Sequence, residues 1–321
     1  MSENENPNAF RPGELNRYSS LTEVAKLSHA IRSTGRPVVL VPLGLPCHAG
    51  NIEAVRAAAS LPRALVIAAL WRGLDDDSSD SAIEDAAQAL SRAGVEVLLS
   101  APAREPRTEV HSPLEGVGRS QLTALARLVL GSGCTDLVLG ERDYRLLIAA
   151  QAMITDLAIP VTLHAIPVIR DRDGLPFSTT LMGLDPAERE AAVALSAALT
   201  AGAFVASEGA DAVLRTVEET VEAAPGVELC SLLLLDPMLG PLAEGATEGR
   251  LLAEVELSAS GERVEDSVGI LLMDREREIA RTALEAAGLD PEISDEEWAE
   301  LRSLQGRVRA AKAEREEREG R

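Results

Sequence analysis

Residues that could do chemistry gather in three short segments of the chain, and the first of these is residues 42–51. It holds Gly44, His48, Gly50 and Asn51 between an apolar run and an Ala-rich run. A glycine-containing turn at the start of a helix offers free backbone N–H groups to an anion. His48 could add a side-chain donor to a phosphate, although a lone loop histidine also suits a purely structural role.

The second segment is residues 140–144, again at the junction of an apolar run and a helical run. The guanidinium of Arg142 could hold phosphate oxygens in its planar fork of N–H groups. Asp143 could bind a metal ion or a ribose hydroxyl. The alternative is an ordinary loop in which Asp143 caps the following helix and Arg142 lies on the surface.

The third segment is residues 170–180. Asp173 and Gly174 form a pair that favours a tight turn, and Ser178 and Thr179 supply hydroxyl groups shortly after it. These hydroxyl groups could donate hydrogen bonds to an anion. A plain hairpin or loop would have the same composition.

The elements that flank these segments must position them. Short apolar runs alternate with helical patterns through the middle of the chain, which predicts an α/β domain with a parallel sheet covered on both faces. In such sheets ligands bind at the carboxyl ends of the strands. We expect strands over residues 38–42, 64–70, 95–99, 136–139 and 161–169, and helices over 52–60, 81–93, 122–130 and 144–157.

The rest of the chain divides into three regions. Residues 1–18 have the composition of a disordered arm, so the sheet domain is expected over residues 19–184. Residues 185–273 combine helical runs with strand-like runs and predict a smaller α+β domain. Residues 274–321 mix charges of both signs, which favours a solvated helical extension.

Composition excludes several classes of function. The formal net charge of −21 argues against a nucleic-acid or anionic-membrane partner, because such surfaces attract basic faces. No apolar run reaches the roughly 18 residues of a membrane span. The three cysteines form no CxxC pair, and an odd number suits a reduced protein, so we expect a cytoplasmic location.

In their order and spacing, the three segments resemble the motifs of the pantothenate synthetase (pantoate–β-alanine ligase) family. Residues 42–51 are similar to its PTMGxLHxGH loop, and residues 140–146 to its GEKDYQQ loop. Residues 173–184 are similar to its DGLAxSSRNxYL loop. The resemblance extends over about residues 20–272 and leaves the charged tail outside it.

The resemblance implies a Rossmann-like domain of the nucleotidyltransferase superfamily, followed by the smaller α+β domain, and a homodimer. It also implies a reaction that uses ATP and Mg²⁺. The carboxylate of pantoate is adenylated, pyrophosphate leaves, and the amine of β-alanine then displaces AMP.

The motif positions also assign site residues, as the resemblance implies. The catalytic residues are His48 and Arg142. The nucleotide-binding residues are Gly50, Asn51, Gly140, Asp143, Ser178 and Thr179. The substrate-binding residues are Leu45, Arg145 and Leu146.

Several positions depart from the family pattern. Asn51 stands in place of a second histidine, and Thr180 stands in place of an arginine. Arg142 replaces a lysine in a chain with only two lysines, and a planar guanidinium is bulkier than an ammonium. Arg145 and Leu146 replace the two glutamines that hold pantoate in the family. The losses affect both the phosphate side and the pantoate side of the site.

Three functions therefore stay open. The chain could be an ATP-dependent ligase of this family, with pantoate or with a changed carboxylate substrate. It could be a catalytically degenerate paralogue that acts as a regulatory or scaffold partner. It could also bind another nucleotide or acid, with Arg72, Arg142 and Arg145 lining an anion pocket, unless these arginines simply pair with local acids such as Glu141.

Overall fold

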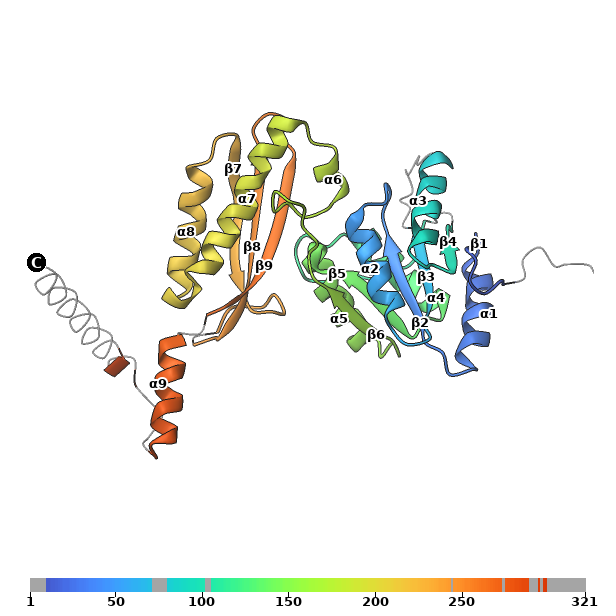
Figure 1. Cartoon of the computed structure of the whole chain (residues 1–321), viewed down its shortest axis with the longest axis horizontal. Helices are drawn as coiled ribbons and strands as arrows, with labels where there is room; N and C mark the ends of the chain where they lie inside the picture. Colours follow the sequence, from blue (N-terminus) through green and yellow to red (C-terminus); the bar gives the residue numbers. More distant parts are fainter. Residues whose placement is uncertain are drawn as a thin grey trace, which may run out of the picture.

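The computed structural model describes two parts, each with a sheet and helices, that lie side by side along the longest axis of the molecule (Figure 1). The described residues are 10–70, 80–101, 105–243, 245–272 and 275–288, with Ser294, Glu297 and Trp298. The larger part precedes the smaller one in the chain, in the order expected from the sequence.

The larger part is built on a six-stranded parallel sheet with the strand order β1-β4-β3-β2-β5-β6. The chain moves outward from β2 through β3 to β4, and then returns to place β5 and β6 on the other side of β2. This reversal is the switch point at which ligands bind in such sheets. The strands are β1 (Asn16–Tyr18), β2 (Val38–Leu43), β3 (Leu65–Leu70), β4 (Val97–Leu99), β5 (Asp136–Gly140) and β6 (Thr162–Ile166).

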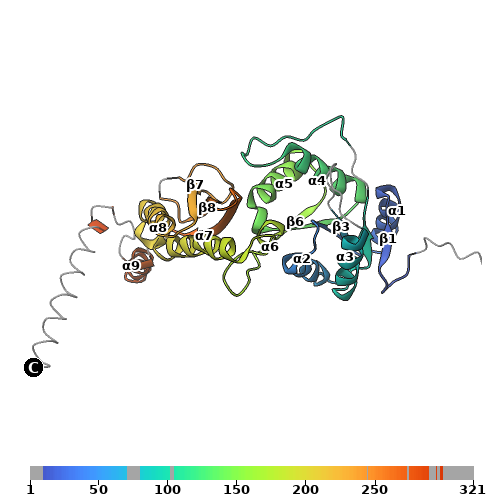
Figure 2. The ribbon, with the colours of Figure 1, turned by 90° about the horizontal axis from the view of Figure 1, so that it is seen from above.

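Helices cover both faces of this sheet (Figure 2). Successive side chains of a strand point to opposite faces, so each central strand feeds two cores. In β2, Val38 and Leu40 pack with α1, α4 and α5, whereas Val39 and Val41 pack with α2 and α3. The helices are α1 (Leu21–Arg32), α2 (Ala49–Ala59), α3 (Asp80–Arg92), α4 (Arg119–Ser132) and α5 (Tyr144–Asp156).

The smaller part is a three-stranded antiparallel sheet with the order β7-β8-β9 and two long helices. Helices α7 and α8 bury one face of the sheet, with Leu251, Val255 and Val264 in that core. The elements are α7 (Pro186–Phe204), α8 (Ala210–Glu222), β7 (Val227–Leu235), β8 (Glu248–Leu257) and β9 (Arg263–Leu271). Short connections are η1 (Glu141–Asp143), α6 (Thr179–Met182) and η2 (Ala206–Glu208), and α9 (Arg275–Ala286) follows β9.

The other face of the small sheet contacts the larger part. Leu252 of β8, Ile148 of α5 and Leu239 of the β7–β8 connection form a buried apolar cluster between the two sheets. Tyr144 packs against this cluster and donates its hydroxyl to the carbonyl of Pro237 at 2.9 Å. The start of α5 therefore belongs both to the large sheet's carboxyl edge and to the contact with the small sheet.

The expectation of a disordered arm over residues 1–18 is wrong for Asn16–Tyr18. These residues pair with β4, with Asn16 opposite Val97 and Tyr18 opposite Leu99. An edge strand needs only backbone partners on one side, so its short, mostly polar sequence carries little apolar alternation. Residues 1–9 lie outside the described residues.

The charged extension is described only in part. Arg275–Ala286 forms α9, as a helical reading of residues 274–321 expects, and most of the remaining extension lies outside the described residues. Among the described residues, no helix combines the length and the apolar character that crossing a membrane requires.

Candidate functional site

A cavity of about 400 Å³ opens at the switch point of the large sheet. Strands β2 and β5 pair only at Val39–Asp136 and Leu40–Leu137. Beyond these pairs β2 and β5 are no longer paired. Pro42 of β2 also has no N–H to donate to a neighbouring strand. The separation of the two strands at their carboxyl ends makes room for the cavity.

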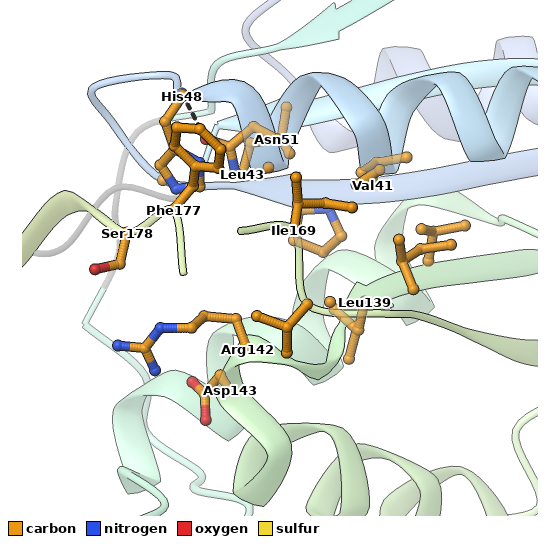
Figure 3. Close-up of a pocket in the computed structure, with 18 of the residues that line it drawn as sticks. Val41, Leu43, His48, Asn51, Leu139, Arg142, Asp143, Ile169, Phe177 and Ser178 are labelled. Atoms are coloured by element: carbon orange, nitrogen blue, oxygen red, sulfur yellow. Dashed lines mark hydrogen bonds between the residues drawn. The ribbon is translucent and has the colours of Figure 1, made fainter. Parts of the chain in front are cut away.

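Three segments far apart in the sequence form the walls of this cavity (Figure 3). Polar side chains, including His48, Arg142, Asp143 and Ser178, gather toward one end. Aliphatic side chains such as Val41 lie toward the other end. The lining residues among the sequence-predicted set are His48, Gly50, Asn51, Gly140, Arg142, Asp143, Leu146, Ser178 and Thr179.

His48 stands at the N-cap position of α2, where its backbone N–H bonds the side-chain Oδ1 of Asn51 at 3.0 Å. Asn51, in the place of a second family histidine, thus fixes the start of the helix. The Nδ1 atom of His48 is buried and has no hydrogen-bond partner in the part of the chain that the structure describes. Burial and, to a smaller extent, the charge of Arg142 lower the pKa of His48 from its ordinary value. His48 is therefore neutral at neutral pH in the ligand-free protein.

Gly50 allows the close approach of the histidine ring to the helix. A Cβ atom at this position would lie 3.2 Å from both Cε1 and Nδ1 of His48, and 3.6 Å from Cβ of Phe177. The first two distances are shorter than ordinary van der Waals contact. The absence of a side chain at Gly50 therefore lets the His48 ring pack closely against the start of α2.

Arg142 reaches the same cavity from the short helix η1, directly after β5. Its Nε atom is buried and lacks a hydrogen-bond partner among the described residues. Two nitrogen atoms from different segments, His48 Nδ1 and Arg142 Nε, are thus buried without protein partners in the described part of the chain, and both belong to residues that line one cavity. Leaving a polar group buried and unpaired costs about 1–3 kcal/mol, so this arrangement suits an anionic ligand that pairs with both.

Asp143 has the structural role of a helix cap. Its Oδ1 accepts the backbone N–H of Leu146 at 3.2 Å and caps α5. Its Oδ2 accepts the side-chain amide of Gln121 at 2.9 Å. Gln121, near the start of α4, also lines the cavity and was not predicted. A single glutamine in a helical run carries no local signal, so only the fold could identify it.

The third segment closes the cavity opposite Arg142. Asp171 accepts the backbone N–H groups of Asp173 and Leu175, and Gly174 at φ +87° completes the expected turn in the left-handed region. Ser178 then caps the short helix α6 by accepting the N–H of Leu181 at 3.1 Å. The turn and the cap together place Ser178 and Thr179 at the cavity.

Leu45 and Arg145 lie elsewhere than expected. Leu45 packs against the apolar core under α2 and α3. Arg145 donates from Nε to Glu265 of β9 at 3.0 Å and from NH1 to the carbonyl of Glu115 at 3.2 Å. Neither residue is among those that line the cavity, and a substrate contact for them stays a prediction. Arg72, the third arginine of the anion-pocket hypothesis, lies outside the described residues.

The described residues contain no cluster of three or more histidine, cysteine or acidic side chains placed to hold a metal ion. The cavity instead offers a histidine, an arginine, hydroxyl groups and helix N-termini. Such a set binds an anion such as a phosphate, with an acidic and an amide group close by.

Comparison with known proteins identifies a family for this chain. A family model described as pantoate-beta-alanine ligase matches residues 16–257. The pantothenate synthetase of Corynebacterium jeikeium (strain K411) is 34% identical over 285 residues, which cover 82% of this chain and 92% of that protein. The pantothenate synthetase of Mycobacterium sp. (strain KMS) is 35% identical over 287 residues, with 82% and 90% covered.

Solved structures show the same fold. The crystal structure of pantothenate synthetase from Thermus thermophilus superposes with a TM-score of 0.67 at 26% identity, covering 78% of this chain and 98% of that one. A pantoate-beta-alanine ligase from Francisella tularensis, complexed with beta-gamma ATP and beta-alanine, superposes with a TM-score of 0.59 at 17% identity. Its coverage is 78% of this chain and 96% of that chain.

Proposed function

The chain belongs to the pantoate-beta-alanine ligase family, and we propose that it is an active ATP-dependent, AMP-forming ligase. It joins a small carboxylate to a small amine, with pantoate and β-alanine as the first pair to test.

The observation that carries the proposal is the pair of buried nitrogen atoms, His48 Nδ1 and Arg142 Nε, that have no partner among the described residues. A triphosphate would satisfy both and would cancel the cost of burying them. Ser178 and Thr179 then supply hydroxyl donors from the opposite wall, and the N-terminus of α2 adds backbone N–H groups. Gly140, at the end of β5, also lines the cavity.

In the proposed reaction a carboxylate oxygen of the substrate attacks the α-phosphorus of ATP, and the bond to the pyrophosphate oxygen breaks. Negative charge grows on the departing phosphates, where Arg142 and a protonated His48 would stabilise it. The amine then attacks the acyl carbon, the amide forms, and AMP leaves. Mg²⁺ would arrive with the phosphates and neutralise part of their charge.

A second candidate is the same chemistry on a different carboxylate. Leu146 lines the cavity with an aliphatic side chain at the position where the family resemblance implies a pantoate-binding glutamine. A site that hydrogen-bonds a hydroxyl group rejects analogues that lack it, and an aliphatic group cannot play that role. Gln121 is the glutamine that lines the cavity among the described residues, and it already binds Asp143.

The experiment is pyrophosphate release by the full chain with ATP, Mg²⁺ and β-alanine, with pantoate or a panel of unhydroxylated branched acids. We expect release that depends on the acid, and a loss of about 10²–10³-fold in kcat for His48→Gln or Arg142→Met. The exposed residues His29 and Arg127 give matched controls, His29→Gln and Arg127→Met, which should retain activity. Release with pantoate identifies the standard reaction, and release only with another acid identifies the second candidate.

A folded chain that neither releases pyrophosphate with any acid nor binds ATP would contradict the proposal. That result would favour a degenerate paralogue with a regulatory or scaffold role. Rescue of a pantothenate auxotroph tests the same point in cells.

We also propose that the protein is a cytoplasmic homodimer. The expectation comes from the family resemblance for the dimer and from the cysteine content for the location. Light scattering of the full chain at micromolar concentration should give twice the chain mass of 34.0 kDa, and a mass of one chain would contradict it.

A further inference from the structure

Three consecutive residues of β9, Glu265, Asp266 and Ser267, each bind an arginine from outside their own strand. We call these residues the β9 triplet. The arginines are Arg145, Arg170 and Arg250. Each belongs to, or contacts, a segment that forms a wall of the cavity.

Two members of the β9 triplet reach the wall that carries Arg142 and Asp143. Glu265 accepts from Nε of Arg145, the second residue of α5, at 3.0 Å. Ser267 accepts from Nε and NH2 of Arg250 at 3.2 and 2.8 Å.

Arg250 extends this connection across the two parts of the molecule. It is 5% exposed, and its NH1 donates to Glu141 at 3.0 Å. Its guanidinium carbon lies 3.6 Å from the ring centroid of Tyr144, a cation–π distance. Arg142 and Asp143 therefore lie in the chain between residues that contact the smaller part. These flanking residues are Glu141, Tyr144 and Arg145.

The third member, Asp266, reaches the opposite wall. It is 1% exposed and binds NH1 and NH2 of Arg170 at 2.6 and 3.1 Å. Arg170 NH1 also donates to the carbonyl of Gly174 at 3.0 Å, inside the turn that precedes Ser178. This contact ties the third segment to the small sheet.

The alternation of a β-strand explains how one short stretch reaches both walls. Residues 265 and 267 share one face of β9, and residue 266 lies on the other. The first face meets η1 and α5, whereas Asp266 meets α7, where the hydroxyl of Ser196 lies 3.4 Å away. The small sheet thus contacts both walls and holds each by a separate ion pair.

We propose that the β9 triplet positions the two walls of the cavity relative to each other, and so sets the geometry in which His48 and Arg142 meet a nucleotide. The proposal rests on the proposed function for the identity of the ligand. Its residues are positioning residues, because they act through three arginines and do not line the cavity.

The test uses substitutions that remove a charge and keep the side-chain shape. Glu265→Gln and Glu141→Gln each weaken one connection, and both residues are partly exposed, with side-chain exposures of 27% and 28%. Asp266→Asn would weaken the connection to Arg170 more strongly, but Asp266 is buried and this variant can fail to fold. The matched control is Arg263→Gln, which breaks two exposed ion pairs between β8 and β9, to Glu254 and Glu256.

The decisive measurement is the NMR titration of the four histidines in the ligand-free full chain, with His48 assigned from the spectrum of His48→Gln. Burial and, to a smaller extent, the charge of Arg142 lower the pKa of His48, so displacement of Arg142 should raise it. Removing a carboxylate alone would lower the pKa of a nearby histidine, so the direction separates the two effects. We expect a rise in both Gln variants and no change in Arg263→Gln.

Calorimetry with ATP gives a second readout. We expect ATP to bind about tenfold more weakly to Glu265→Gln and Glu141→Gln, and within twofold of the parent protein to Arg263→Gln. If the parent protein does not bind ATP, the proposed function fails while the histidine titration still decides the role of the β9 triplet. Folded Gln variants in which the pKa of His48 does not rise would overturn the positioning role.

Discussion

His48 and Arg142 meet in the cavity because two loops that follow neighbouring strands end at the same edge of the sheet. Both residues and their segments can be identified from the sequence. The sequence does not predict that His48 Nδ1 and Arg142 Nε lack hydrogen-bond partners among the described residues, because this depends on the positions of all neighbouring side chains. Asn51 illustrates the difference, since its substitution for a histidine reads as a loss but its side chain orders the start of α2.

The lowered pKa of His48 predicts that ATP binding takes up a proton. In the free protein His48 is neutral near pH 7, and a triphosphate beside it favours the imidazolium. ATP affinity should therefore rise as the pH falls from about 7.5 to about 6.5, the ordinary histidine value. Calorimetry in two buffers of different ionisation enthalpy measures the uptake.

The control for this prediction is His48→Gln, because ATP itself titrates in the same range. The difference in proton uptake between the parent protein and His48→Gln measures the protons that His48 takes up. A difference of zero would mean that His48 does not contact the phosphates. The same lowered pKa means that the ligand-free protein loses a little stability as the pH falls below about 6.5, where the unfolded chain binds the proton more readily.

Gly50→Ala tests the close approach of the histidine ring. The added methyl would lie 3.2 Å from Nδ1 of His48, so the ring must move. We expect kcat/KM for ATP to fall by about 10–100-fold with little change in thermal stability. Gly183→Ala is the matched control, since its Cβ would meet the carbonyls of Thr180 and Thr179 at 3.5 and 4.0 Å, which are ordinary van der Waals distances. Equal kinetics for both variants would contradict the packing role of Gly50.

At the scale of elements, the sequence predicts the regular strands and helices well because their patterns are local. The β-branched apolar run before the histidine loop is a strand, Val38–Leu43, and the Ala-rich run after it is a helix, Ala49–Ala59. The edge strand β1 and the helix α1 (Leu21–Arg32) were missed. Both are amphipathic or polar elements at the border of the sheet, where tertiary contacts rather than local pattern decide the structure.

Alanine ordinarily stabilises a helix relative to glycine, but the packing of α7 on α8 predicts the opposite at Gly202. Gly202→Ala should destabilise the protein by about 1–3 kcal/mol, because the new Cβ would lie 2.7 Å from Cγ2 of Val217, a stiff β-branched side chain. Urea unfolding measures the change.

The control is Gly131→Ala in α4. Its Cβ would lie 3.1 Å from the end of the flexible Leu21 side chain, which can move aside. This variant should be neutral or more stable by up to about 1 kcal/mol. Stabilisation of both variants would contradict the close packing of the two helices.

At the scale of the molecule, the order of the two parts follows from the sequence, but the way they join does not. Nothing local in the β8 sequence shows that Arg250 lies 5% exposed between Glu141 and Ser267. Arg145 is a similar case, because its partner Glu265 follows it by 120 residues and no local pattern predicts this pair. Pairs so distant in the chain are set by the docking of the two sheets.

The apolar part of this junction gives a stability prediction. Leu252→Ala removes a side chain that is 1% exposed between α5 and β8, and it should cost about 2–5 kcal/mol of unfolding free energy. The same change at Leu271, which is 68% exposed, should stay within about 0.5 kcal/mol. Chemical denaturation of both variants provides the comparison, and equal midpoints would mean that the two parts do not pack through Leu252.

A crystal structure of the full chain with Mg²⁺ and a non-hydrolysable ATP analogue would show whether the cavity binds a triphosphate. We expect phosphate oxygens within hydrogen-bond distance of His48 Nδ1 and Arg142 Nε, the two buried nitrogens without partners in the described residues. We also expect Ser178 on the opposite side of the phosphates. A nucleotide bound elsewhere, or a cavity in which both nitrogens acquire protein partners and exclude the analogue, would contradict it.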